Sequence, residues 1–188
     1  MEKINLKAEG KLIEFFIALL FIGIGIIFRL MPHAPNFTPI AAIALFGGIY
    51  LSKRTAFILP VLALMISDIF IGFYEPKLMI AVYGSFLLCV ILGLYLKAHK
   101  KWYTVLGGSV AGSVSFFLVT NFAVWAFTPW YAKTFSGIIQ CYLMALPFFK
   151  NTLMGDLFYI ILFFGIYEGV ELWIKKKYGY PVYKPSLV

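Results

Sequence analysis

Long apolar runs separated by short polar or basic blocks form the main pattern along the chain. The runs are continuous, whereas a membrane β-barrel would show short segments in which apolar and polar residues alternate. Backbone polar groups must be satisfied internally in a bilayer, so continuous runs of this length predict helices. Five runs have the length of a complete span: residues 12–30, 55–74, 78–96, 103–127 and 152–174.

Two further apolar stretches are too short for a comfortable span. Residues 40–51 predict either a short second helix, around which the bilayer thins, or one half of a broken helix. Residues 138–149, within a mixed stretch at 128–151, predict an outer re-entrant or interfacial segment. We therefore expect an all-α, polytopic membrane protein of about six transmembrane helices, with residues 1–188 forming a single integral membrane domain.

The composition agrees with a bilayer as the main partner. The chain is 62% hydrophobic and 13% charged, which leaves too little polar surface for a soluble domain. Its net charge of +8 sits in short loops and tails, so we expect no nucleic-acid partner. Cys89 and Cys141 lie in apolar segments without CxxC spacing and are expected to be small buried hydrophobes.

The basic residues predict the orientation, because cytoplasmic loops are enriched in Lys and Arg. Both termini are placed in the cytoplasm, and the protein in the cell (inner or plasma) membrane. Twelve of the 16 Lys and Arg residues then lie inside: Lys3, Lys7, Lys11, Lys53, Arg54, Lys97, Lys100, Lys101, Lys175, Lys176, Lys177 and Lys184. The outside holds the other four: Arg29, Lys77, Lys133 and Lys150.

This topology gathers scattered polar residues into one outer layer. Ionisable groups at membrane depth are costly and need a reason, so the layer is a candidate substrate-binding site. Its members are Arg29, His33, Asn36, Thr38, Asp68, Asn121, Trp125, Asn151 and Asp156. Three interpretations stay open: a structural pair of Arg29 with Asp68 or Asp156, the wall of an outward-facing polar cavity, and a proton or ion relay.

A proline-rich block, residues 32–39, follows the first span. Its three prolines restrict the backbone and remove donors, which predicts a stiff, non-helical connection. Irregular backbone at membrane depth is tolerated only where protein or a water-filled cavity covers it. The block therefore points to a cavity at the start of the short second helix, with His33 as a loop residue or a ligand contact.

Small residues recur at helical spacing in two spans. Ala44 and Gly48 form one pair, and Gly108 and Gly112 form another. Such pairs let helix backbones approach closely in lipid. They predict packing inside the bundle or docking against a partner protein.

The motifs of common catalytic sites do not occur in the sequence. It has no HExxH, no Gly-x-Ser-x-Gly and no phosphate-binding glycine loop. The two histidines, His33 and His99, are placed on opposite sides of the membrane. We therefore expect no enzyme activity, no cofactor and no histidine metal site.

Residues 29–48, which read RLMPHAPNFTPIAAIALFGG, together with Ser67-Asp68 and Gly72, carry a family resemblance. They resemble a family of small bacterial membrane proteins of unknown function. That family in turn is similar to the substrate-binding S components of energy-coupling-factor (ECF) vitamin transporters. The resemblance implies six spans, cytoplasmic termini and a vitamin site near the outer face, with residues 32–39 in the lid.

One departure concerns the energising partners. Many S components carry an Ala-x-x-x-Ala pattern in the first span for docking onto a coupling subunit. Here the nearest match is Ala44-x-x-x-Gly48 in the second span. The resemblance therefore implies either an ECF-type coupling subunit with its ATPases or a solitary S-like protein, with cobalamin as the first substrate guess.

Three functions follow as hypotheses. The first is a substrate-binding membrane component for uptake of a vitamin-like small molecule, which binds on the outer side. The second is a proton- or ion-coupled secondary transporter that uses Asp68 or Asp156. The third is a non-transporting scaffold of the cell envelope, in which the polar layer only fixes packing.

Overall fold

The computed structural model describes residues 2–178, without the side chains of residues 2–11, 13, 174 and 178. These residues form six α-helices and one 3₁₀ turn, and they contain no strand. The elements are α1 (Glu2–Leu30), α2 (Ile40–Tyr50), α3 (Lys53–Ile71), α4 (Pro76–Leu96), η1 (Lys97–His99), α5 (Trp102–Phe127) and α6 (Phe135–Tyr178). The predicted all-α class is confirmed for this part of the chain. Lys184, predicted to be cytoplasmic, lies outside the described residues.

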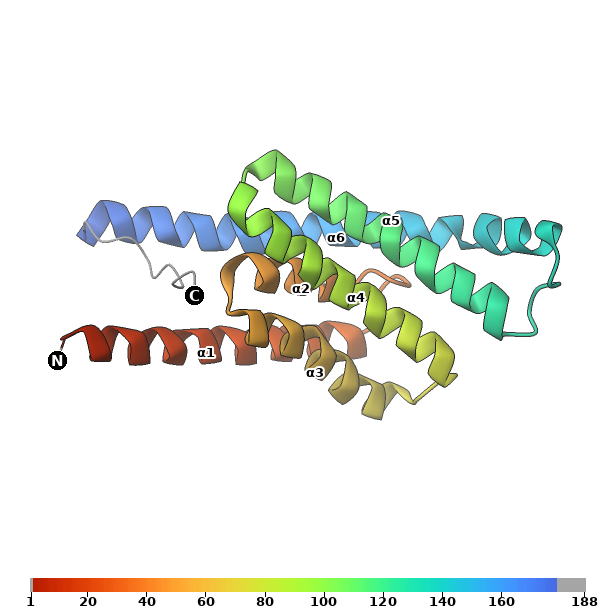
Figure 1. Cartoon of the computed structure of the whole chain (residues 1–188), viewed down its shortest axis with the longest axis horizontal. Helices are drawn as coiled ribbons and strands as arrows, with labels where there is room; N and C mark the ends of the chain where they lie inside the picture. Colours follow the sequence, from red (N-terminus) through yellow and green to blue (C-terminus); the bar gives the residue numbers. More distant parts are fainter. Residues whose placement is uncertain (1, 179–188) are drawn as a thin grey trace.

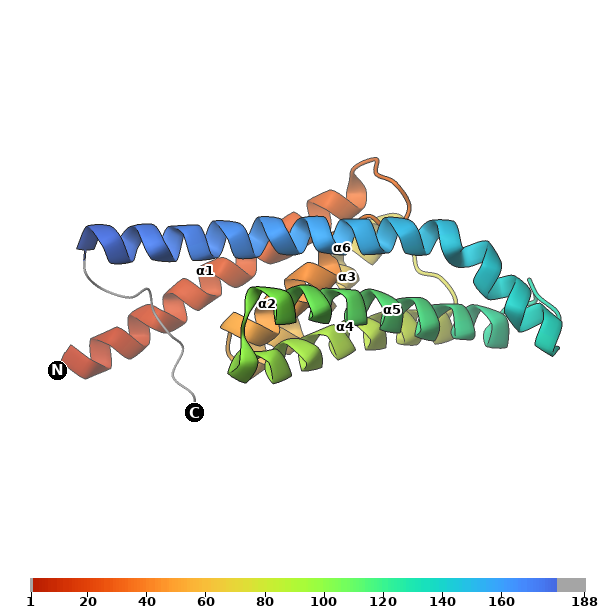
Figure 2. The same cartoon turned by 90° about the horizontal axis from the view of Figure 1, so that it is seen from above.

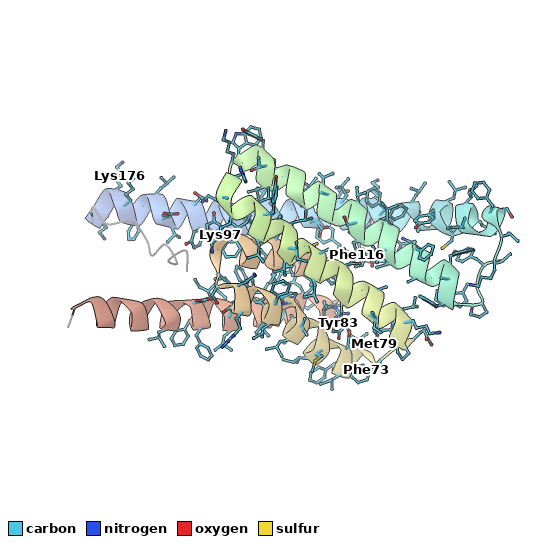
Figure 3. All side chains as sticks on the ribbon, in the orientation of Figure 1. Phe73, Met79, Tyr83, Lys97, Phe116 and Lys176 are labelled. Carbon is cyan, nitrogen blue, oxygen red and sulfur yellow. The ribbon has the colours of Figure 1, made fainter. Side chains whose placement is uncertain are left out.

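Successive helices alternate in direction along the bundle (Figure 1). The start of α1, the α2–α3 turn, η1 and the end of α6 share one end, called here the terminal end. The connections 31–39, 72–75 and 128–134 share the opposite, distal end (Figures 1 and 2). Lys97 and Lys176 lie toward the terminal end, and Phe73 and Met79 lie toward the distal end (Figure 3).

Four helices in the described part are long and apolar enough to cross a membrane: Lys53–Ile71, Pro76–His99, Trp102–Phe127 and Phe135–Lys177. Large apolar side chains also point outward, where lipid rather than water suits them. Examples are Leu20, Ile69, Ile80, Leu118, Leu143 and Ile161. The protein therefore has the helices of a membrane protein, while the count of six spans and the sidedness stay predictions.

The short helix α2 lies at the centre of the bundle. All of its 11 residues are buried, and it contacts the other five helices. A helix of this length rises only about 16 Å, which is roughly half of a 30 Å hydrocarbon core. A helix that is apolar all round is buried either in protein or in lipid, and here protein surrounds it.

Close backbone contacts hold α2 against α4. A Cβ atom on Gly48 would lie 2.5 Å from the carbonyl oxygen of Val90 and 2.8 Å from Cα of Gly93. A Cβ atom on Gly93 would lie 2.4 Å from the carbonyl oxygen of Leu45. Only hydrogen fits on either side of this crossing, so both glycines are required for the observed spacing.

The other predicted small residues also face inward. Ala44 is fully buried, Gly108 packs beneath Leu96, and Gly112 faces the sulfur of Cys89. These positions pack within the protein's own bundle. A partner protein cannot reach Ala44 or Gly48 in this conformation, so docking at that pair does not agree with the structure.

The re-entrant alternative for residues 138–149 is wrong, and the interfacial alternative stays a prediction. This stretch is the first part of α6, a continuous helix of 44 residues with Pro147 inside it. Figure 2 shows α6 bending in this region, as a proline inside a helix allows. The stretch stays helical because it runs along α5, where Phe117 packs on Phe149 and Tyr142 donates to the carbonyl of Leu118.

Candidate functional site

A cavity of about 340 Å³ lies between the connections 31–39 and 72–75 and the start of α2. Its polar lining comes from elements that are far apart in the sequence: Arg29, His33, Asn36, Thr38, Tyr74, Thr152 and Asp156. Apolar side chains complete the wall: Ile40, Ala41, Leu64, Ile71, Val82, Phe86 and Phe116. Five of the nine predicted site residues therefore line one cavity.

The connection 31–39 is held over the cavity by Phe37. The ring of Phe37 packs against Tyr159 of α6, and a Cβ atom on Gly155 would lie 3.2 Å from Cα of Phe37. The backbone N–H of Phe37 donates to the carbonyl of Ala34 at 3.0 Å, and this hydrogen bond closes a tight turn. Asn36 sits in this turn at a φ of 64°, in the left-handed region that asparagine tolerates better than most residues. The turn places His33, Asn36 and Thr38 at the cavity mouth.

Arg29 forms its ion pair with Asp68 and not with Asp156. Its Nη2 lies 2.8 Å from Oδ1 of Asp68, a side chain with no exposed surface. The other guanidinium nitrogen, Nη1, donates to the hydroxyl of Ser67 and, at 3.4 Å, to the carbonyl of Leu64. Tyr83 of α4 donates to Oδ2 of Asp68 at 2.7 Å. The pair therefore ties α1, α3 and α4 together at the side of the cavity, and Asp68 itself stands behind the wall.

Asp156 is in a different electrostatic situation. It is only 3% exposed, and it lines the cavity from α6. The hydroxyl of Ser113 donates to Oδ2 at 2.6 Å, while Oδ1 has no hydrogen-bond partner among the described residues. No Lys, Arg or His of the described part lies within 4.0 Å of its oxygens. The cavity wall thus carries a carboxyl group without a cation.

Tyr74, in the short α3–α4 connection, adds a hydroxyl to the lining. Burial raises the pKa of this phenol, and the nearby negative charge of Asp68 raises it further, against a smaller opposing effect of Arg29. Tyr74 therefore keeps its proton and offers the cavity a hydrogen-bond donor.

Three predicted site residues lie away from the cavity. The amide of Asn121 donates to the carbonyl of Phe117 within its own helix, at 2.8 Å. Trp125 donates to the carbonyl of Ala132 at 2.9 Å, with Lys133 over its ring, so it fastens the α5–α6 connection. Asn151 is half-buried on α6 beside Thr152 and does not reach the cavity. The connection between α5 and α6 lies farther along the bundle than the connection 31–39 (Figure 1).

The sequence analysis missed several residues that the fold brings to the site. Thr152 lies one helical turn before Asp156, and this spacing predicts that both side chains share one face of the helix. Ser113 follows Gly112 in the small-residue stripe of α5, but nothing in the sequence pairs it with α6. Tyr83 and the aromatic rings of Phe86 and Phe116 carried no signal, because apolar residues surround them in the sequence.

No group of three or more His, Cys, Asp or Glu side chains in the part of the chain described above is arranged to hold a metal ion. Cys89 and Cys141 are both free and buried, as expected for small hydrophobic side chains.

Comparison with models of known protein families identifies the family of the chain. The model described as a family of unknown function (DUF6580) matches residues 10–181. Neither a curated protein nor a solved structure matches the chain.

Proposed function

Because the chain belongs to the family of unknown function DUF6580, we propose its function from the cavity itself. The protein is the substrate-binding membrane component for uptake of a vitamin-like small molecule. The molecule binds in the distal cavity, on the side that the basic residues assign to the outside. The protein takes part in no chemical step, and its residues bind and orient the molecule.

The observation that carries this proposal is the composition of the cavity wall. Helices and connections from residues 29 to 156 contribute polar side chains to one pocket within a largely apolar body. Ligand pockets commonly have this character, an apolar wall with a few placed polar groups, and their volumes run from roughly 300 to 1,000 Å³. At about 340 Å³ the cavity suits a compact ligand. We therefore propose a ligand smaller than cobalamin, which was the first substrate guess.

The resemblance to S components agrees with this arrangement. The start of α1 and the end of α6 share the terminal end (Figures 1 and 2), and residues of the first connection line the cavity. In this proposal residues 31–39 cover the ligand. An ECF-type coupling subunit with ATPases remains the proposed energising partner, and its contact is on an outer face of the bundle because α2 is enclosed.

A second candidate function rests on Asp156 alone. A buried carboxyl group without a cation is also what a proton- or ion-coupled transporter uses to carry its coupling ion. The two functions differ in what Asp156 does: it contacts the ligand in the first and exchanges a proton or ion in the second.

Filling the cavity tests the first function. Val82→Phe places a larger ring in the wall, whereas Val110→Phe makes the same change on the outside of α5, at a side chain that is 39% exposed. Native mass spectrometry of the detergent-purified proteins should show a co-purified small molecule on wild type and Val110→Phe, and its loss from Val82→Phe. An equal ligand load on all three proteins, at equal thermal stability, would place the ligand elsewhere and refute the proposal. A ligand-free wild type whose uptake activity survives in Val82→Phe would do the same.

A further inference from the structure

The charges around the cavity do not balance. Arg29 is the cation of the wall, and its charge is matched by Asp68 at 2.8 Å. Both of its terminal nitrogens point to groups of α3, namely Asp68, Ser67 and the carbonyl of Leu64. Asp156 has no corresponding cation among the described residues. A ligand in the cavity therefore faces one acidic group, Asp156, that has no cation beside it.

The environment of Asp156 makes this imbalance costly. A carboxylate in a low-dielectric interior needs an opposite charge or several hydrogen bonds, and Ser113 supplies a single bond to one oxygen. The second oxygen has no partner in the described part of the chain. A positively charged group placed in the cavity would supply both the charge and the missing donor.

The apolar part of the wall suits the rest of such a ligand. Phe86 and Phe116 line the cavity, and their ring centroids lie 5.1 Å apart. Aromatic faces attract cations and pack well against flat apolar groups. An anionic ligand of the same shape would face Asp156 with like charge, while the charge of Arg29 is already paired with Asp68.

From these observations we infer that the cavity selects a small organic cation, whose positively charged nitrogen pairs with Asp156 and whose flat or apolar body packs on Phe86 and Phe116. This inference rests on the proposed function, because it specifies the ligand of the same cavity. It identifies Asp156 as a specificity-determining residue rather than a member of the Arg29–Asp68 pair.

Three probes of similar shape and different charge test the inference: benzylamine, benzyl alcohol and benzoate. Binding to detergent-purified protein is measured by isothermal titration calorimetry, with ligand-observed NMR where affinity is low. Benzylamine should bind most tightly and benzoate least. Asp156→Asn should weaken benzylamine binding about tenfold or more, in line with the loss of a charge-assisted bond, and leave benzyl alcohol unchanged.

Two further variants keep the test independent of folding defects. Glu171→Gln removes a carboxylate from the same helix far from the cavity and should leave all three affinities unchanged. Ser113→Ala keeps the charge of Asp156 and should alter benzylamine binding less than Asp156→Asn does. If Asp156→Asn does not fold, the order of the three probes on wild type decides the question.

The possible failures are distinguishable. If benzyl alcohol or benzoate binds as tightly as benzylamine and Val82→Phe abolishes that binding, the cavity binds ligands but the charge inference is wrong. If all three probes fail to bind wild type, the inference is also wrong. Loss of the proposed function has its own signature, a co-purified ligand that Val82→Phe retains. Benzylamine affinity that is equal in wild type and Asp156→Asn would show that Asp156 does not pair with the cation, and the charge inference would be wrong.

Discussion

Two buried acidic residues, Asp68 of α3 and Asp156 of α6, have different surroundings in this protein. Asp68 has a cation, a tyrosine hydroxyl and no exposed surface, whereas Asp156 has a single serine hydroxyl and a cavity beside it. A buried ion pair of the first kind contributes little net stability, because desolvation offsets much of the attraction. Removing one partner is far more costly than removing both. The two carboxylates therefore respond differently to substitution.

The first prediction concerns the Arg29–Asp68 pair. Arg29→Met should lower the free energy of unfolding by about 3–5 kcal/mol, because Asp68 is left buried without its cation. The double variant Arg29→Met/Asp68→Leu should recover most of that loss. Thermal unfolding in detergent measures both effects. The half-exposed pair Lys100–Glu168, whose nitrogen and oxygen are 2.6 Å apart, is the control, with an expected coupling of about 1 kcal/mol or less.

Failure of the double variant to recover would contradict a structural role for the pair. Since Arg29 also lines the cavity, ligand affinity provides a second readout. The recovered double variant should still bind the co-purified ligand more weakly than wild type. Full recovery of stability with unchanged affinity would limit Arg29 to packing and count against its place in the binding site.

At the level of elements, two backbone contacts decide how the helices and the distal connection are placed. The first is the Gly48–Gly93 crossing, which lets α4 lie directly on the buried helix α2. The second is the contact between Phe37 and Gly155, which sets the position of residues 31–39 above the cavity. Both contacts need the absence of a side chain, and neither involves a charge.

The second prediction concerns the α2–α4 crossing. Gly93→Ala should destabilise the protein by about 1–3 kcal/mol, because the added methyl meets the carbonyl oxygen of Leu45 at 2.4 Å and the helices must separate. Gly84→Ala on the same helix should be neutral or slightly stabilising, since no atom lies within 4 Å of its added Cβ. Melting temperatures of the two variants give the comparison. Equal melting temperatures would show that the bundle does not depend on this contact.

The third prediction concerns the lid-forming connection. Gly155→Val should push Phe37 off α6 and weaken ligand binding by displacing His33, Asn36 and Thr38 from the cavity mouth. Gly165→Val makes the same change further along α6, where the added Cβ meets nothing within 4 Å. Ligand affinity should fall in the first variant only. A normal affinity in Gly155→Val, at normal stability, would mean that the connection does not shape the site.

At the scale of the whole molecule, the alternating helices separate a basic end from a cavity end. The start of α1, the end of α6, Lys97 and Lys176 lie toward one end, and the connections over the cavity lie toward the other (Figures 1 and 3). The predicted orientation with cytoplasmic termini requires that the cavity opens to the outside. The side of the membrane that the termini face therefore also determines the side from which the ligand enters.

The fourth prediction tests the sidedness. Single cysteines at Asn36 and Lys133 should react with a membrane-impermeant maleimide in whole cells, because both lie in distal connections. Cysteines at Arg54 and Lys101 should react only after the membrane is opened. The unmodified protein is the control, since Cys89 and Cys141 are 2% and 1% exposed. External labelling at Lys101 would overturn the orientation and place the cavity on the cytoplasmic side.

The sequence by itself determined which residues form helices and which polar residues are candidates for one site. Run length, prolines and basic blocks are local properties, so the ranges expected for the short second helix and the neighbouring spans lie close to the observed ones. The proline-rich connection and the placement of Arg29 and Asp156 near one cavity followed from the same topology.

Only the tertiary structure decided how each helix is rotated and tilted, and therefore which side chains meet. A lipid-facing side is as apolar as a buried one, so the hydrophobic pattern of α5 or α6 does not show which face turns inward. Hence the sequence left open whether Arg29 pairs with Asp68 or Asp156, placed Asn121 and Trp125 with the site, and missed Ser113 and Tyr83. The continuity of α6 through Pro147 also depends on tertiary packing, because this part of α6 packs against α5. The sequence of residues 135–178 alone does not show that contact.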